Sequence, residues 1–229
     1  MKKHDIPWLI LWFLIYVGFL VLEIITGKCL AVTILKYSGL VLCFLYALIY
    51  ARKDTFLILA LALTLVADGI LAFDNVSELG AMVFIFVQLA HLLRFSAIRR
   101  TSPLIPILLA AFIMATGLVQ NGIPLMFVLA MAYGVLIFTN IYEAWRWMRL
   151  DRNMVARCAF FGFILFFLCD LMVGISYITT TATLPHTVTI VTSYFAWLLY
   201  LPAQVLITLS GKRNELGAEK VSDLPEIEF

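Results

Sequence analysis

Long uninterrupted runs of apolar residues constrain this chain more than any other feature of its sequence. Eight segments carry enough of them to cross a bilayer: 6–26, 30–50, 54–73, 77–98, 103–120, 122–147, 156–178 and 187–209. A helical crossing needs roughly 20 apolar residues, because about 30 Å of hydrocarbon is covered at about 1.5 Å per residue. The sequence therefore predicts an all-α polytopic membrane domain with eight transmembrane helices over residues 1–210.

The composition argues against a soluble globular protein. Hydrophobic residues make up 64% of the 229 residues, charged residues make up 13%, and the mean hydropathy is +1.04. A soluble core cannot absorb so much apolar surface. Only residues 211–229 form a long polar stretch, which we expect to be a disordered cytoplasmic tail.

The basic residues indicate how the chain lies in the membrane. Fourteen of the 16 lysines and arginines fall on one side of the eight-helix arrangement: Lys2, Lys3, Arg52, Lys53, Arg94, Arg99, Arg100, Arg146, Arg149, Arg152, Arg157, Lys212, Arg213 and Lys220. Cytoplasmic loops are enriched in lysine and arginine. We therefore expect an integral protein of a bacterial plasma membrane with both termini in the cytoplasm. The first apolar run is too long for a signal-peptide core and is expected to be retained.

Several classes of function find no support in the sequence. The motifs GxGxxG, GxSxG, HExxH and the P-loop are missing, so we expect no cofactor. The three histidines lie far apart, which predicts no metal site of the histidine-rich kind, while a carboxylate-bound metal stays open. The four cysteines form no CxxC pair and are typical of packing residues. The net charge of +2 is explained by the cytoplasmic loops and indicates no nucleic-acid partner.

Two aspartates lie inside the apolar runs. Asp68 occurs in LTLVADGILAF and Asp170 in FILFFLCDLMVGI, and both segments run outward in the predicted topology. The similarity between them is compatible with two four-helix halves related by a parallel repeat, or with chance. An ionisable side chain at the centre of a bilayer costs roughly 2.5–3.5 kcal/mol, so it normally faces the interior of a helix bundle and pairs there.

Depths counted along the helices place the polar side chains in two layers. Counted from the outer ends at about 1.5 Å per residue, Lys36 and Asp68 lie roughly 8–9 Å down and Asp170 roughly 12 Å down. A deeper layer holds Gln88, His91, Tyr200 and Gln204, and further candidates are Glu23, Tyr133, Asn140, Glu143 and Tyr194. Glu23 and Glu143 lie near the interfaces, where we expect water to solvate them.

Lys36 can form a structural ion pair with one aspartate, or take part in a functional site. One lysine cannot neutralise two aspartates, so one carboxyl group is protonated or a second cation helps. We expect Lys36, Asp68 and Asp170 to face one another across an internal cavity. Pro202, two residues before Gln204, has no N–H for the carbonyl of Leu198 and predicts a kink with a freed carbonyl there.

Taken together, these motifs resemble the YhhN-type lysoplasmalogenase family. The resemblance rests on Lys36, on Asp-x-x-Leu at Asp68, on His91 in AHLLRF, on Asp170 in LCDLM, and on Tyr-x-x-Ala-Gln from Tyr200 to Gln204. It extends over the whole plan of spans. The chain departs from the family pattern at four neighbouring positions, namely Tyr37, Ala67, Arg94 and Cys169.

The resemblance implies hydrolysis of the vinyl-ether bond of lysoplasmalogen or a related ether lysolipid, giving a fatty aldehyde and a glycerophospho-alcohol. Protonation of the vinyl carbon calls for an acid, an anion near the resulting cation, and a base for water. Asp68 and Asp170 are the candidate catalytic residues. Substrate binding or support would fall to Lys36, His91, Tyr200, Gln204, Gln88 and Tyr133. The partners expected are a lysophospholipid or other lipid substrate and the lipids of the membrane.

Two other classes of function share these features. A proton-coupled transporter of small molecules also carries carboxylates at mid-membrane and a helix broken by proline. A non-catalytic membrane protein that binds lipid would use the polar layer only to seat a headgroup.

Overall fold

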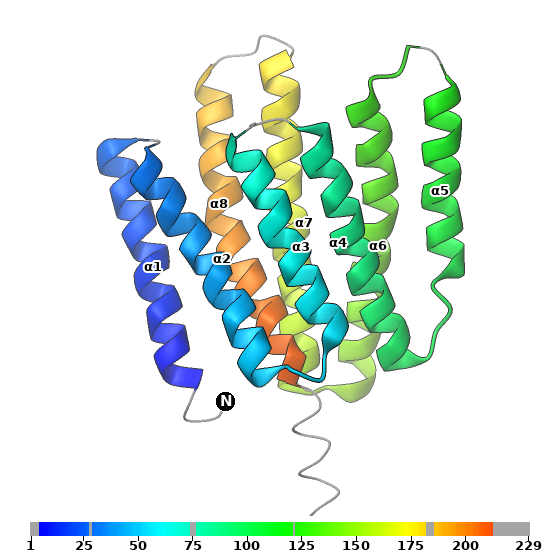
Figure 1. Ribbon diagram of the computed structural model, residues 1–229, viewed down its shortest axis with the longest axis horizontal. Helices are drawn as coiled ribbons and strands as arrows, with labels where there is room; N and C mark the ends of the chain where they lie inside the picture. Colours follow the sequence, from blue (N-terminus) through cyan, green and yellow to red (C-terminus); the bar gives the residue numbers. More distant parts are fainter. Residues whose placement is uncertain (1–4, 28, 74–76, 121, 182–185, 213–229) are drawn as a thin grey trace, which may run out of the picture.

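The protein is a bundle of α-helices. The computed structural model describes residues 5–27, 29–73, 77–120, 122–181 and 186–212. Within these ranges it contains eight α-helices and no strand (Figure 1): α1 (Asp5–Thr26), α2 (Leu30–Tyr50), α3 (Thr55–Phe73), α4 (Glu78–Arg99), α5 (Leu104–Val119), α6 (Leu125–Asp151), α7 (Met154–Thr181) and α8 (His186–Leu209). The prediction of an all-α polytopic membrane protein is confirmed.

Seven of these described helices are long and apolar enough to cross a membrane. The exception is α5, which has 16 residues and is apolar but short. In contrast, α6 and α7 have 27 and 28 residues. Helix α6 extends beyond its predicted span at its C-terminal end, and α7 does so at both ends. A 3-10 turn at Ser210–Lys212 follows α8. The remainder of the expected polar tail, from residue 213, lies outside the described residues.

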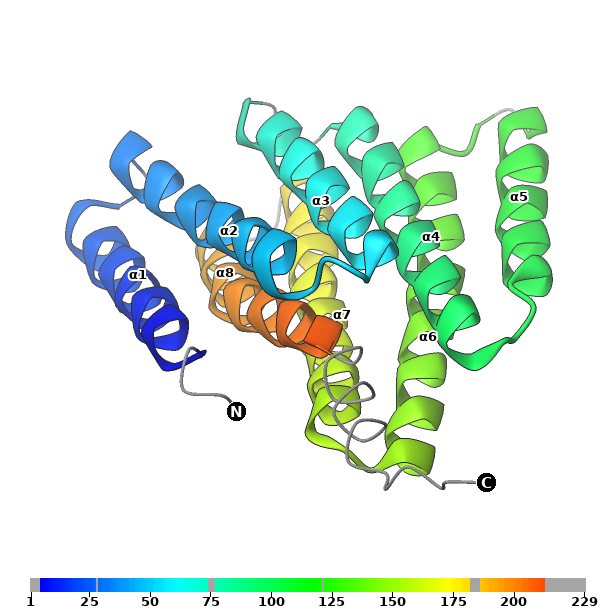
Figure 2. The same ribbon diagram turned by 60° about the horizontal axis from the view of Figure 1, so that its bottom comes forward.

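Six helices form a ring, and the other two pack outside it. Around the ring, α2 contacts α3, α3 contacts α4, α4 contacts α6, α6 contacts α7, α7 contacts α8, and α8 contacts α2. Figure 2 shows α1 beside α2 and α8 on one flank, and α5 beside α6 on the other. Side chains that point into the ring therefore come from helices distant in the sequence. The connections rich in lysine and arginine lie at the end where α1 begins and α8 ends, which we call the basic end.

The packing order has a twofold regularity. If the first four helices are matched to the last four, the α1–α2, α2–α3 and α3–α4 contacts correspond to α5–α6, α6–α7 and α7–α8. The remaining contacts of the ring, α4–α6 and α8–α2, correspond to each other. This order is the one that two related halves would give. It places Asp68 on α3 and Asp170 on α7, which are matched helices.

Helices α7 and α8 pack closely at Gly162. A Cβ atom at this position would lie 3.0 Å from the backbone nitrogen of Ile207 and 3.2 Å from the carbonyl oxygen of Ala203. Few real Cβ atoms lie so close to backbone atoms of another helix, so glycine favours this close approach of the two backbones. This contact fixes the depth of α8 against α7, and with it the depth of the polar residues on both helices.

Pro202 lies inside α8. Proline cannot donate a backbone hydrogen bond, so the carbonyl oxygen of Leu198 has no helical partner. The hydroxyl group of Tyr16, on the outer helix α1, donates to that oxygen at 2.9 Å. The predicted free carbonyl is therefore present, and a side chain from another helix pairs with it, as expected for backbone at membrane depth.

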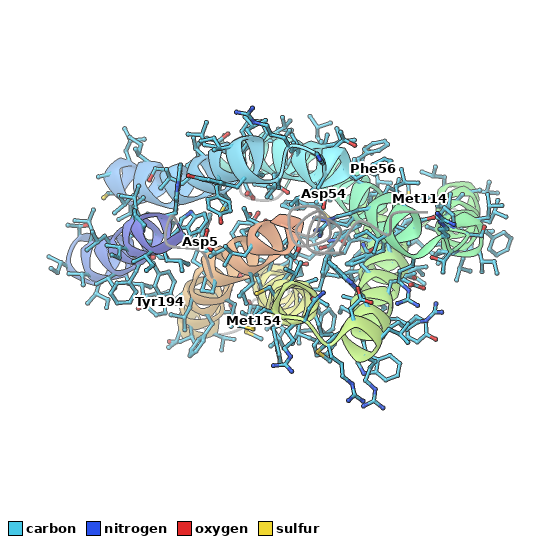
Figure 3. The ribbon with its side chains drawn as sticks, turned by 90° about the horizontal axis from the view of Figure 1, so that it is seen from below. Asp5, Asp54, Phe56, Met114, Met154 and Tyr194 are labelled. Carbon is cyan, nitrogen blue, oxygen red and sulfur yellow. The ribbon has the colours of Figure 1, made fainter. Side chains whose placement is uncertain are left out.

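Arg94 does not lie in a loop, as the distribution of basic residues had suggested. The sequence places it with the loop arginines, but its side chain is 1% exposed and points into the bundle. Its Nε donates to Asp54 Oδ2 at 2.8 Å, and its two terminal nitrogens donate to the hydroxyl and the carbonyl oxygen of Ser210, each at 2.9 Å. Figure 3 shows Asp54 beside the end of α8. Arg94 thus ties α4 to the start of α3 and the end of α8.

Candidate active site

Asp68 lies on α3, which is separated from α8 in the ring by α2 alone. Its Oδ2 accepts a hydrogen bond of 2.5 Å from the hydroxyl group of Tyr200 on α8. Tyr200 is 5% exposed, and its ring packs against Phe166 and Trp197 with centroid distances of 5.8 Å and 5.5 Å. The tyrosine therefore spans from α8 to α3 and has little freedom to move.

Asp170, on α7, accepts a short hydrogen bond at Oδ2 from the hydroxyl group of Tyr133 on α6. The same hydroxyl accepts a bond of 2.9 Å from Nε2 of Gln88 on α4. Asn140, on α6, completes the group, since its Nδ2 donates to Oε1 of Gln88 at 2.8 Å and to the backbone carbonyl of Gln88 at 2.9 Å. Four polar side chains from three helices thus form one connected network.

The two carboxyl groups belong to a single cluster. The carboxyl groups of Asp68 and Asp170 are close enough to interact electrostatically. Each of them also interacts electrostatically with Cys169 and with Tyr200. Asp68 and Asp170 are half-buried, so part of each residue stays accessible. Phe166 lies beside this cluster, since its ring contacts that of Tyr200 as well as that of Phe84 on α4. The structure thus brings together the two aspartates that the sequence singled out.

Lys36 is found with a partner that the sequence did not predict. Its Nζ bonds to Oε1 of Glu23 on α1 at 2.8 Å, and the two side chains are 6% and 9% exposed. The expectation that Glu23 is solvated was wrong, because α1 packs on α2 and the Glu23 side chain is buried against Lys36. Lys36 Nζ also lies 4.6 Å from the ring centroid of Trp197, whose ring contacts Tyr200. The lysine therefore adjoins the aspartate cluster through aromatic rings; the predicted cavity stays a prediction.

His91 and Gln204 are buried with incomplete hydrogen bonding. Each residue is 1% exposed. Within the described ranges, Nδ1 of His91 and both amide atoms of Gln204 find no hydrogen-bond partner, and the ring of His91 lies edge-on to Phe163 at 4.9 Å. An unpaired buried polar atom is costly unless water or a ligand completes it. These atoms are therefore candidate positions for water or for polar groups of a substrate.

Two further candidates lie away from this cluster. Glu143 is only 10% exposed, and its carboxylate contacts Arg146 at 2.9 Å and Arg99 at 3.3 Å. It is thus part of an ion-paired group near the basic end, and the expectation of a solvated side chain was wrong here too. Tyr194 lies on the outer side of α8 (Figure 3) and faces away from the interior of the ring.

Three aromatic residues beside the predicted site residues were not predicted from the sequence to belong to the site. Tyr37 donates its hydroxyl to the carbonyl oxygen of Leu65 at 2.9 Å and lies within electrostatic range of Asp68. Trp197 separates Lys36 from Tyr200, and Phe163 covers His91. Aromatic residues are so frequent in this chain that only their contacts distinguish these three. The one signal available was position, since Tyr37 follows Lys36 directly.

The arrangement suits proton transfer between carboxyl groups and a substrate. Two carboxyl groups share one site, each with a tyrosine hydroxyl as hydrogen-bond donor. Such a pair can supply one proton and accept another in the same reaction. Among the residues that the structure describes, no three His, Cys, Asp or Glu side chains lie together in the manner of metal ligands.

Comparison with known proteins identifies one relationship. The sequence model of the YhhN family matches residues 31–211, which is well over half of the chain and covers α2 to α8. No curated protein and no solved structure gives a significant match.

Proposed function

The chain belongs to the YhhN family, and from that premise we propose that it is an integral membrane hydrolase that cleaves the vinyl-ether bond of lysoplasmalogen or a related ether lysolipid. The observation that supports this most is that Asp68 and Asp170 interact electrostatically and that each accepts a hydrogen bond from a tyrosine hydroxyl group. The products would be a fatty aldehyde and a glycerophospho-alcohol. No cofactor is required, since acid–base chemistry is sufficient for this bond.

In the first step, one aspartate acts as the acid. It transfers its proton to the vinyl carbon farther from the ether oxygen, and an oxocarbenium ion forms across the other carbon and that oxygen. The second aspartate is a carboxylate at this stage and stabilises the positive charge. Glycosidases meet the same demand with two carboxyl groups. General acid–base catalysis of this kind typically contributes about 10²–10⁴-fold.

In the second step, water adds to the cationic carbon and gives one proton to the second aspartate. The product of this addition is a hemiacetal. The hemiacetal then collapses: its hydroxyl proton passes to the first aspartate, and the second aspartate returns its proton to the departing glycerol oxygen. Both aspartates end in their initial states. The net reaction consumes one molecule of water and breaks one carbon–oxygen bond.

The neighbouring residues have supporting roles in this proposal. Lys36 is the candidate partner for the phosphate group, and it adjoins Tyr200 through Trp197. His91 and Gln204 carry polar atoms without protein partners, which suits them to hold water or the glycerol hydroxyl. Gln88 and Tyr133 support Asp170, while Tyr200 supports Asp68. The lipid would enter from the membrane, with both termini of the protein on the cytoplasmic side.

The direct test is an assay of purified protein in detergent with a 1-alkenyl lysophospholipid, in which released aldehyde is measured. We expect aldehyde release by the wild type, and a loss of about 10²–10⁴-fold in Asp68→Asn and in Asp170→Asn, which keep volume but cannot act as acid or base. Thr139→Val is a matched control, because among the described residues the Thr139 hydroxyl bonds only to the carbonyl of Val135 on its own helix.

Two results would contradict the proposal. A folded wild type without aldehyde release would leave a transporter or a lipid-binding protein as the function, and these separate by uptake of labelled solute into proteoliposomes. Stably folded asparagine variants with full activity would show that the carboxyl groups are structural.

A further inference from the structure

The hydrogen-bond network at Asp170 has a direction that one backbone atom determines. The carbonyl oxygen of Gln88 can only accept, so the Asn140 atom 2.9 Å from it must be the NH2 group. The second hydrogen of that NH2 group points to Gln88 at 2.8 Å, so the Gln88 atom there must be its oxygen, Oε1. The other end of the Gln88 amide is then the nitrogen, Nε2, which donates to the hydroxyl oxygen of Tyr133 at 2.9 Å.

This direction carries through to the carboxyl group. Because Tyr133 already accepts from Gln88, its own hydrogen is left for Oδ2 of Asp170. Gln88 and Asn140 are 0% exposed, so neither amide can turn over without leaving further buried polar groups unpaired beyond Oδ1 of Asn140. Every bond from Asn140 to Asp170 therefore donates toward the carboxyl group.

Asp68 has a different environment. It also accepts from a tyrosine hydroxyl, that of Tyr200. In the part of the chain that the structure describes, however, no group donates to Tyr200. Its hydrogen is therefore free to turn away, and the oxygen of Tyr200 can accept a hydrogen bond from a protonated Asp68. The bond between Tyr200 and Asp68 survives in either protonation state, whereas the bond between Tyr133 and Asp170 requires an acceptor at Oδ2, and a carboxylate is a stronger acceptor there than the carbonyl oxygen of a neutral acid.

We propose that the Asn140–Gln88–Tyr133 network holds Asp170 as the carboxylate, and that Asp68 is therefore the general acid. The assignment rests on the proposed hydrolysis. A carboxylate is favoured by donors directed at it, and it disfavours a second negative charge nearby. The titratable groups that face Asp170 are Tyr133 from α6, Asp68 from α3, Tyr200 from α8 and its neighbour Cys169. Asn140 and Gln88 are positioning residues, because they act through Tyr133.

The first test needs no substrate. Infrared spectra of the purified protein at pH 7 report protonated carboxyl groups by their C=O stretching band. We expect Asp68→Asn to remove a component of this band and Asp170→Asn to leave it in place. Any other pattern overturns the assignment: loss in Asp170→Asn, loss in both, or loss in neither. If the wild type released no aldehyde, the proposed function would fail, while this measurement would still decide which aspartate holds the proton.

The second test reverses the network at Gln88. Gln88→Met removes the donor to Tyr133, and Tyr133→Phe removes the donor to Asp170; each is expected to lower kcat/KM about 10–100-fold, which corresponds to one hydrogen bond to a charged group. Gln88→Glu presents a carboxylate that accepts from Tyr133 and turns its hydrogen away from Asp170, so we expect a loss larger than that of Gln88→Met.

The pH profile separates this effect from a structural one. In Gln88→Met and Tyr133→Phe the acidic limb of kcat/KM should move toward neutral pH, because Asp170 loses donors that favour its charged form. The control Thr139→Val lies next to Asn140 on α6 and should change neither the rate nor the profile. Unchanged profiles in folded variants, or Gln88→Glu as active as Gln88→Met, would overturn the proposal. If the Gln88 variants fail to fold, the profile of Tyr133→Phe decides.

Discussion

The guanidinium group of Arg94 makes the contacts that we expect to contribute most to the stability of the bundle at the basic end. It is 1% exposed, donates to Asp54 and to two atoms of Ser210, and lies 5.9 Å from the ring centroids of Phe95 and Trp147. Removal of one partner from a buried ion pair typically costs about 3–5 kcal/mol, because a charge is left without its counterion.

Asp54→Ala should lower the stability in two ways, by removing the counterion of Arg94 and by removing the cap at the start of α3. Oδ1 of Asp54 accepts from the backbone nitrogen of Leu57 at 3.2 Å at the start of α3, and loss of such a cap adds about 1 kcal/mol. The sum is about 4–6 kcal/mol, which corresponds to a fall in Tm of roughly 10–20 °C for a chain of this size. Asp54→Asn keeps the cap and an acceptor oxygen, so its Tm should fall by less than half as much.

The Tm values can be measured by thermal unfolding in one detergent, monitored by circular dichroism. The double variant Arg94→Met/Asp54→Asn should recover most of the stability lost in Asp54→Ala, because neither charge is left alone. It should not recover all of it, since the carbonyl of Ser210 loses its donor. An Asp54→Ala protein within about 1 kcal/mol of wild type would refute the reasoning and mean that Arg94 reaches the headgroup region by extending its side chain.

Two further predictions follow from contacts outside the ring. Tyr16→Phe leaves the carbonyl of Leu198 unpaired and should cost about 1–3 kcal/mol of unfolding free energy. In a Pro202→Ala background the same change should cost close to nothing, because residue 202 again supplies an N–H. Equal costs in both backgrounds would contradict this. The Thr26 hydroxyl beside Cys29 lowers the pKa of that thiol, so at pH 7.5 a membrane-impermeant maleimide added outside cells should label Cys29 readily. Thr26→Val should raise the pKa and slow the labelling, and labelling from the cytoplasmic side alone would reverse the topology.

The number of helices and their approximate bounds could be predicted from the sequence, because a span is defined by length and hydropathy. Where the predicted bounds differ, polar residues extend the helix: α6 continues to Asp151, whose carboxylate accepts from the indole nitrogen of Trp147 at 2.7 Å. Hydropathy cannot detect this last helical turn, because its residues are polar and lie beyond the hydrocarbon core.

Membership of the site could be predicted only in part. Depth counting placed Tyr200 and Gln88 in a deeper layer than Asp68 and Asp170, yet Tyr200 bonds to Asp68 and Gln88 is one residue from Asp170 in the network. The count assumed that all helices end at one level, whereas α7 and α8 rise past α2 and α3 (Figure 1). Partner choice, such as Lys36 with Glu23, depends on how each helix is rotated, and a single sequence carries no measure of that.

The short helix α5 has a consequence for the lipids around the protein. Its 16 residues cover about 24 Å, roughly 6 Å less than a typical hydrocarbon core, and Ala110 is its only buried residue. Annular lipids on this flank have to shorten to match it, at a fraction of a kcal/mol for each ångström. The bilayer should therefore be thinnest beside α5, and a thicker host membrane should raise the free energy of the folded protein mainly through this flank.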